Sequence, residues 1–204
     1  MISRPIAATF AGAALTILVA GCGSGTGFPT SSSGLPTSTS RDISVPSTWG
    51  SGQPTFPHRR NSGNDGTSYE PCLGLSDEAA LSIGVDPKAM KDAALVDGQT
   101  ARGCDWRYTD QVGWTVSQIV GNAPDLDHYK ITQKDSKWRE DVTVNGRHVG
   151  ISEFTADTCS THVQSERAIV TTIVQYASPK SPPIDEICDR AIAFTKATIG
   201  GMPR

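Results

Sequence analysis

Apolar residues are distributed unevenly along this chain of 204 residues. A short apolar run covers residues 6–19, residues 22–68 show little apolar content and no periodicity, and apolar patterns then recur from Tyr69 onward. A segment with so few apolar residues cannot offset its ordering entropy, whereas about 136 residues are enough to bury one core. The pattern predicts a signal peptide over residues 1–21, a disordered tether over residues 22–68 and one domain over residues 69–204.

Three stretches of the predicted domain have apolar residues at helical spacing. Ser76 is a typical N-cap before an acidic first turn, which predicts a short helix behind it. A second helix is expected over residues 124–134, with Pro124 at its start. The last helix should open at Ser181-Pro182-Pro183, and its buried stripe consists of Ile184, Ile187, Cys188, Ala191, Ile192, Thr195 and Ile199.

Alternation of apolar and polar residues predicts strands joined by tight turns. The clearest signal is Asn145-Gly146 between β-forming residues, because both residues tolerate the positive φ of a two-residue hairpin turn. Residues 86–100 are expected to be irregular. The order of elements predicts an α+β domain, an antiparallel β-sheet with helices packed on it. The strands are expected at residues 104–108, 114–120, 142–144, 147–149, 159–164 and 168–174, the last of them central in the sheet.

Residues 19–22, Val-Ala-Gly-Cys, resemble the bacterial lipobox, where a lipoprotein signal peptidase cuts before the cysteine. Arg4 and the apolar run complete a secretory signal, which is too short for a membrane-spanning helix of ~20 residues. The resemblance implies lipidation of Cys22 by a diacylglycerol, with a further acyl chain such as palmitate on its amine. Cys22 would then anchor the chain to the extracytoplasmic face of the cell membrane. The alternative is an ordinary secreted protein with an incidental cysteine.

The tether is rich in Ser, Thr, Gly and Pro, which permits either O-glycosylation or a plain solvated spacer. Its basic spot, His58-Arg59-Arg60, is expected to be solvated rather than to form a docking motif. Removing residues 1–21 removes Arg4 and no acidic residue, which leaves 17 basic and 21 acidic side chains and a net charge of −4. Nucleic acid is excluded as a partner on this balance, because it requires a concentrated basic face.

Four cysteines remain once Cys22 is assigned to lipidation, and an even number in an exported chain favours disulfides. Cys104 has the inward parity of its strand, and Cys72 precedes the helix that must pack on the same sheet. Cys159 likewise points inward, and Cys188 lies on the buried stripe of the last helix. We therefore predict the disulfides Cys72–Cys104 and Cys159–Cys188, each of which joins a helical segment to the sheet.

No catalytic residue, metal site or cofactor is predicted from the sequence. Cys159 and His162 lie three residues apart in a strand and point to opposite faces, so they do not share a metal ion. A disulfide and a surface imidazole account for the two residues. His128 and His148 occur in polar contexts where a solvated histidine is expected rather than a general base.

The order and spacing of several short motifs resemble a family of actinobacterial, mycobacterial-type cell-envelope lipoproteins that is defined by a four-cysteine domain of unknown function. The likeness covers residues 69–203 and the lipobox. It implies no catalytic residues, and the order of elements is similar to the Mog1/PsbP-type α+β fold. The motifs are Pro71-Cys72, Gly103-Cys104-Asp105-Trp106, Val144-Asn145-Gly146, Cys159 and Cys188.

Two classes of function follow from these observations. The favoured one is a membrane-anchored binding or protein-interaction module that engages an envelope protein or a lipid ligand. The alternatives are an exported enzyme with a non-local active site and a carrier of lipids or small molecules. Trp106, Trp114 and Trp138 would line an apolar ligand site, but the first two share the apolar parity of their strands, which favours core packing.

Overall fold

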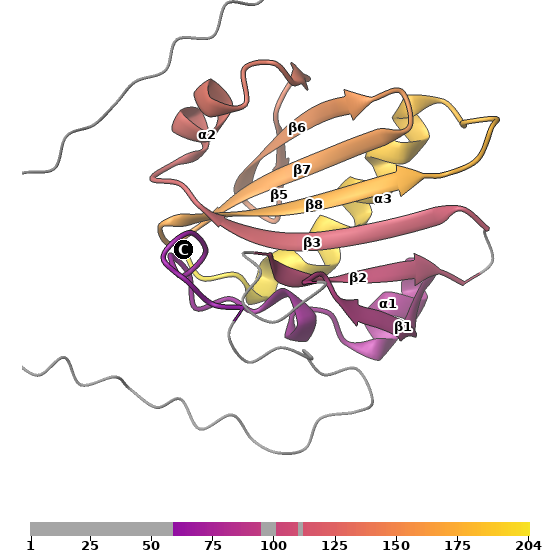
Figure 1. The fold of residues 1–204 in the computed structure, drawn as a ribbon, viewed down its shortest axis with the longest axis horizontal. Helices are drawn as coiled ribbons and strands as arrows, with labels where there is room; N and C mark the ends of the chain where they lie inside the picture. Colours follow the sequence, from indigo (N-terminus) through magenta and orange to yellow (C-terminus); the bar gives the residue numbers. More distant parts are fainter. Residues whose placement is uncertain (1–58, 95–100, 110–111) are drawn as a thin grey trace, which may run out of the picture. The chain divides into compact units, whose positions relative to one another are not determined.

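In the computed structural model, which describes residues 59–94, 101–109 and 112–204, the eight strands within those ranges form one antiparallel sheet (Figure 1). The predicted α+β fold is therefore confirmed. The signal peptide, Cys22 and residues 23–58 of the predicted tether lie outside the described residues. In spatial order the strands are β1 (Val85–Asp92), β2 (Arg102–Tyr108), β3 (Trp114–Asn122), β8 (Ala168–Tyr176), β7 (Thr158–Ser165), β6 (Arg147–Thr155) and β4 (Lys137–Trp138), and β5 (Val142–Val144) pairs with β6.

The three predicted helices are present, and side-chain caps begin two of them. The Ser76 hydroxyl accepts from the backbone N–H of Ala79 at 3.2 Å, and Asp125 Oδ1 accepts from the N–H of His128 at 2.6 Å. These bonds satisfy N–H groups that have no partner inside the helix. The helices are α1 (Asp77–Ser82), α2 (Leu126–Thr132) and α3 (Ile184–Thr198), and the 3-10 turns η1 (Pro71–Leu73) and η2 (Ile199–Gly201) precede α1 and follow α3.

Helix α3 packs across one face of the sheet, where it contacts β7 and β8 (Figure 1). Most of the predicted stripe is buried, namely Ile187, Cys188, Ala191, Thr195 and Ile199, whereas Ile184 and Ile192 are half-buried. Phe194, which the prediction did not include, is buried as well. Trp106 and Trp114 are 3% and 5% exposed, and the ring centroid of Trp106 lies 5.2 Å from that of Phe194. The prediction that these two tryptophans belong to the core is therefore confirmed.

A polar seam runs between α3 and the sheet. The Gln118 amide donates to Thr172 Oγ1 and Thr198 Oγ1, both at 3.0 Å, and accepts from the Tyr69 hydroxyl at 2.7 Å. Thr195 of α3 donates to Thr172 at 3.2 Å. These groups are buried and mutually bonded, so the seam fixes how α3 sits on the sheet without leaving a polar group unpaired.

The opposite face of the sheet, here called the open face, is covered only in part. Leu126 of α2 packs there against Ile169 of β8, and Tyr129 stacks near His162 of β7. At the end formed by β1, β2 and β3, the open-face side chains are exposed or half-buried. An antiparallel sheet with one solvated face needs alternating polar residues, and Asp105, Arg107, Thr115, Ser117 and Gln175 supply them.

Two sequence-based expectations about the domain are wrong. The region expected to be irregular contains β1, whose pairing with β2 is interrupted between Asp86 and Lys91. The domain also begins earlier than Tyr69, because Arg59, Asn64 and Thr67 are at most 4% exposed. Residues 59–70, here called the strap, hydrogen-bond to the sheet instead of forming a solvated tether; Gly66 N–H, for example, donates to Asn122 Oδ1 at 2.7 Å.

The predicted hairpin turn is confirmed. Asn145 and Gly146 have φ values of 49° and 74°, and Val144 pairs with Arg147 across the turn. A two-residue turn of this kind needs positive φ at both positions, which asparagine and glycine adopt at low cost. The central position of β8, between β3 and β7, is confirmed as well.

Candidate functional site

The four cysteines of the domain form the two predicted disulfides. Cys72–Cys104 joins η1 to β2 with a Cα–Cα distance of 5.2 Å, and Cys159–Cys188 joins β7 to α3 at 5.1 Å. All four residues are at most 5% exposed. Both bridges therefore lie inside the core, where they hold helical segments against the sheet.

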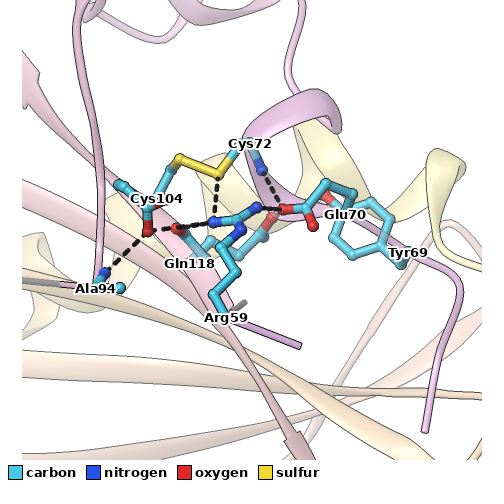
Figure 2. The surroundings of a disulfide bond; sticks show 9 residues. Arg59, Tyr69, Glu70, Cys72, Ala94, Cys104 and Gln118 are labelled. Atoms are coloured by element: carbon cyan, nitrogen blue, oxygen red, sulfur yellow. Dashed lines mark hydrogen bonds and ion pairs between the residues drawn. A yellow bond between two sulfur atoms is a disulfide. The ribbon is translucent and has the colours of Figure 1, made fainter. Parts of the chain in front are cut away.

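Arg59 of the strap lies directly beside the first disulfide (Figure 2). Its Nη1 donates to Gly103 O at 2.9 Å and to Cys72 Sγ at 3.3 Å. The same guanidinium forms ion pairs with Glu70 and, at 3.2 Å, with Asp92 Oδ1. With its side chain 5% exposed, Arg59 is a buried, multiply bonded cation, and the expectation that this basic spot is solvated is wrong for Arg59.

His162 is the most strongly perturbed histidine of the described domain. It is 4% exposed, its Nε2 lies 2.9 Å from Ser152 Oγ, and its Nδ1 lies 3.1 Å from Thr171 Oγ1. Burial lowers the pKa of His162 to about 3, and the nearby Lys130 cation adds to this effect. The expected surface imidazole is therefore a neutral, buried one, although it does lie on the face opposite Cys159 as predicted.

Two aromatic rings enclose His162 on the open face. The ring centroids of Tyr129 and Trp138 each lie 5.0 Å from the imidazole. Gly150 is the cross-strand partner of His162, and a Cβ atom there would lie 3.1 Å from the Trp138 ring. The glycine thus leaves room for Trp138 to close over the histidine. Trp138 therefore helps to cover His162 from solvent.

His128 and His148 are exposed, as expected from the sequence. His148 Nε2 lies 2.8 Å from Asp141 Oδ2, with its side chain 63% exposed. Within the described ranges, no three His, Cys, Asp or Glu side chains gather in a way that could hold a metal ion.

The open face contains a polar pocket at the interruption between β1 and β2. Its volume is about 300 Å³, and Lys91, Asp105, Arg107, Thr115, Ser117 and Gln175 contribute polar side chains to its lining. The strand register explains why these residues meet: Lys91 faces Asp105, Asp105 faces Ser117, Arg107 faces Thr115, and Thr115 faces Gln175. Cross-strand partners project to the same face, so four strands deliver their polar side chains to one place.

The charged residues of this pocket do not neutralise one another. Within the described part of the chain, Lys91, Asp105 and Arg107 form no ion pair or side-chain hydrogen bond. Asp86, the cross-strand partner of Arg107, accepts instead from the backbone N–H of Lys88 at 2.9 Å. Side chains on a surface that serves only solubility are often unpaired, but here two cations and one anion converge on a single hollow.

A second hollow adjoins the pocket at the ends of the strands. It has a volume of about 550 Å³ and shares Arg107 and Thr115 with the pocket. Val112, Trp114 and Ala177 give it a more apolar lining. Together the two hollows offer charged, hydroxyl and apolar groups side by side, which is the mixture that ligand sites typically present.

Comparison with known proteins identifies the family of this chain. The model of the DUF3558 family, proteins of unknown function, matches residues 17–200. The chain belongs to this family. No curated protein and no solved structure matches this DUF3558 chain. The match confirms the resemblance to a family defined by a domain of unknown function.

The disulfides bear on where this DUF3558 protein resides. Its two disulfides indicate an oxidising, extracytoplasmic compartment. No helix among the described residues is long and apolar enough to cross a membrane.

Sequence reasoning did not identify the pocket, but it oriented two of its residues correctly. It placed Asp105 and Arg107 on the solvent side of their strand, because they alternate with Cys104 and Trp106. It missed Lys91, because Pro87 and the long interruption in β1 hide the strand pattern there. Register between strands that are distant in sequence, such as Thr115 opposite Gln175, is not visible in any local motif.

Proposed function

We propose that this protein is an extracytoplasmic binding module, anchored to the membrane by a lipid on Cys22, and that the pocket on its open face is the binding surface. The lipobox and the pair of disulfides support the location. The observation that carries the binding role is the convergence on one hollow of Lys91, Asp105 and Arg107, which have no ion-pair partner among the described residues. A ligand would supply the partners that these charges lack.

The pocket favours a polar ligand over a lipid chain. Hydroxyl, amide and charged side chains form most of its lining, and the core side of the sheet is filled by Trp106 and Phe194. A lipid carrier would enclose an acyl chain in apolar surface. The proposed module instead presents polar groups on the solvated face of the sheet.

Site-specific photocrosslinking in the native envelope tests the binding surface. A photoreactive phenylalanine analogue would replace Thr115 or Gln175, which line the pocket, or Lys196, which is exposed on α3. We expect a discrete adduct by mass spectrometry from the two pocket positions and none from Lys196. Equal adducts at all three positions, or no adduct at the pocket, would refute the proposed surface.

One observation favours an enzyme as the second candidate. The distance of 2.9 Å between Ser152 Oγ and His162 Nε2 is that of a nucleophile and its base. Both residues are 4% exposed beneath Tyr129 and Trp138, so the pair could react only if this cover moved.

A fluorophosphonate probe tests this alternative. It would label Ser152 in the parent protein and not in Ser152→Ala if the pair is catalytic. The binding proposal expects no labelling of Ser152. Ser160→Ala is the matched control, because Ser160 is buried on the same face and its loss should leave any labelling of Ser152 unchanged.

A further inference from the structure

We infer that the pocket on the open face binds the carboxyl terminus of a peptide whose last side chain is apolar. The inference deepens the binding role proposed above and rests on it. Two observations support this inference: the positions of the charged and polar groups that line the pocket, and the apolar hollow that adjoins it.

The two cations identify the carboxylate position. The Arg107 guanidinium can hold a carboxylate through two parallel hydrogen bonds, and Lys91 adds a point charge on the same face. Neither has an ion-pair partner in the described part of the chain. Asp86 lies opposite Arg107, but its Oδ1 accepts from the N–H of Lys88. An anionic group of a ligand would therefore complete the site.

Asp105 distinguishes a peptide from a simple anion. It lies directly opposite Lys91 and two residues from Arg107 on the same face of β2, so a bare phosphate or sulfate would meet its negative charge. A ligand that carries a hydrogen-bond donor a few ångströms from its carboxylate turns this repulsion into a bond. The last amide N–H of a peptide is such a donor, and Ser117 and Gln175 can bond the neighbouring amide groups.

The adjoining hollow accounts for the apolar side chain. Arg107 and Thr115 line both hollows, so a carboxylate held by Arg107 places the Cα atom of its residue at their junction. From there a side chain enters the space lined by Val112, Trp114 and Ala177. Carboxylate, amide and apolar side chain thus each meet a matching surface, a combination that a sugar or a free inorganic anion does not offer.

Peptide titrations of the full chain in detergent micelles test the inference. N-acetyl-Ala-Leu and its carboxamide would be added to isotopically labelled protein, and shifts of the Thr115, Ser117 and Gln175 amide signals followed by NMR. We expect the acid to bind and the carboxamide to bind at least about tenfold more weakly, because a charge-assisted bidentate contact is lost.

Variants locate the carboxylate. Arg107→Gln should weaken binding of the acid by about tenfold and remove its preference over the carboxamide. Arg167→Gln, at an exposed arginine of the β7–β8 turn, should leave both affinities unchanged. Equal affinity of acid and carboxamide, or full binding by Arg107→Gln, would overturn the inference.

The crosslinking experiment separates the two proposals. Adducts at Thr115 and Gln175 without peptide binding would reject the peptide class and leave the binding surface standing. Failure of both experiments would reject both. The mass of an adduct also distinguishes the two sources of such a carboxylate, a free short peptide and the carboxyl terminus of an envelope protein.

Discussion

At the residue scale, Arg59 holds the strap to the sheet. Its guanidinium bonds a backbone carbonyl, a disulfide sulfur and two carboxylates, at a position where water has almost no access. Arg102 acts nearby in the same way: it is 2% exposed and donates to the carbonyl of Thr67 at 3.0 Å, and burial lowers its pKa to about 10. These two arginines supply the hydrogen-bond donors that solvent would otherwise give to polar groups of the strap, which have no partner in a neighbouring strand.

We predict that Arg59→Gln lowers the free energy of unfolding by about 3–5 kcal/mol, because Asp92 and Glu70 lose their cation in a buried site. Arg60→Gln is the matched control. Arg60 is exposed, and within the described ranges its side chain donates only to Thr67 O, so we expect a cost below about 1 kcal/mol. Urea denaturation measures both, and equal costs would contradict the buried role of Arg59.

His162 predicts a pH dependence of stability. Its pKa is about 3 in the folded domain and ~6.5 in an unfolded chain, so the unfolded state binds the extra proton between these values. The stabilising effect of the neutral imidazole is complete above pH ~6.5. It is lost on acidification toward pH ~3, at up to roughly 1.4 kcal/mol per pH unit.

The comparison of His162→Gln with the parent isolates this effect from that of the carboxylates. The variant should show a shallower fall of stability between pH ~6.5 and ~4. His128→Gln, at an exposed histidine, should follow the parent curve. Parallel curves for the parent and His162→Gln would show that the imidazole does not titrate with folding.

These two residues also mark the limit of sequence reasoning at this scale. His162 was correctly placed on the face opposite Cys159, but its burial depends on Trp138 and Tyr129, which reach it from other elements. Arg59 lies in a segment with little apolar content, and it becomes buried through bonds to Asp92 and Gly103, which are 33 and 44 residues away in the sequence. Such contacts depend on tertiary structure, so composition predicted solvation at both positions.

At the element scale, the two disulfides allow a controlled comparison. They close loops with sequence separations of 32 and 29 residues, so the restriction of the unfolded chain is nearly the same for both. Each should contribute about 3–4 kcal/mol on this model. Any further difference between them must come from contacts in the folded state.

We predict that the double substitution Cys72→Ser and Cys104→Ser lowers the free energy of unfolding more than Cys159→Ser and Cys188→Ser does. The reason is that Arg59 of the strap donates a hydrogen bond to the Cys72 sulfur. Introducing Arg59→Gln into both pairs completes a double-mutant cycle. Coupling to Arg59 is expected for the Cys72–Cys104 pair and not for the Cys159–Cys188 pair. Equal coupling in denaturant unfolding would show that Arg59 acts independently of the bridge.

Most elements were predictable because their signals are local. The Ser76 and Asn145-Gly146 signals each depend on neighbouring residues, and the disulfide pairing followed from strand parity and the helical stripe. Strand β1 was missed because residues 87–90 bulge out against a single residue of β2. That same interruption opens the polar pocket, so the irregular element and the candidate site have one cause.

At the scale of the whole molecule, the fold places the packed core and the proposed binding surface on different faces of the sheet. Helix α3, both disulfides and the polar seam lie on one face, and Lys91, Asp105 and Arg107, which form no ion pair among the described residues, lie on the other. Substitutions at Arg107 or Lys91 should therefore change binding without affecting the packed face. The same division explains how a strand such as β2 can supply Cys104 to the core and Asp105 to the pocket.

The proposed membrane location depends on lipidation of Cys22, and Cys22→Ser tests it. The parent chain should incorporate labelled palmitate and sediment with membranes, because two or more acyl chains give stable anchoring. The variant should lose the label and leave the membrane fraction, whereas Ser24→Ala should behave like the parent. The four cysteines of the domain pair with one another, so the variant should keep the parent's unfolding midpoint. Loss of membrane association with an unchanged midpoint would assign the anchor to Cys22 rather than to the folded domain. Retention of labelled lipid by Cys22→Ser would place the anchor elsewhere and refute this part of the proposal.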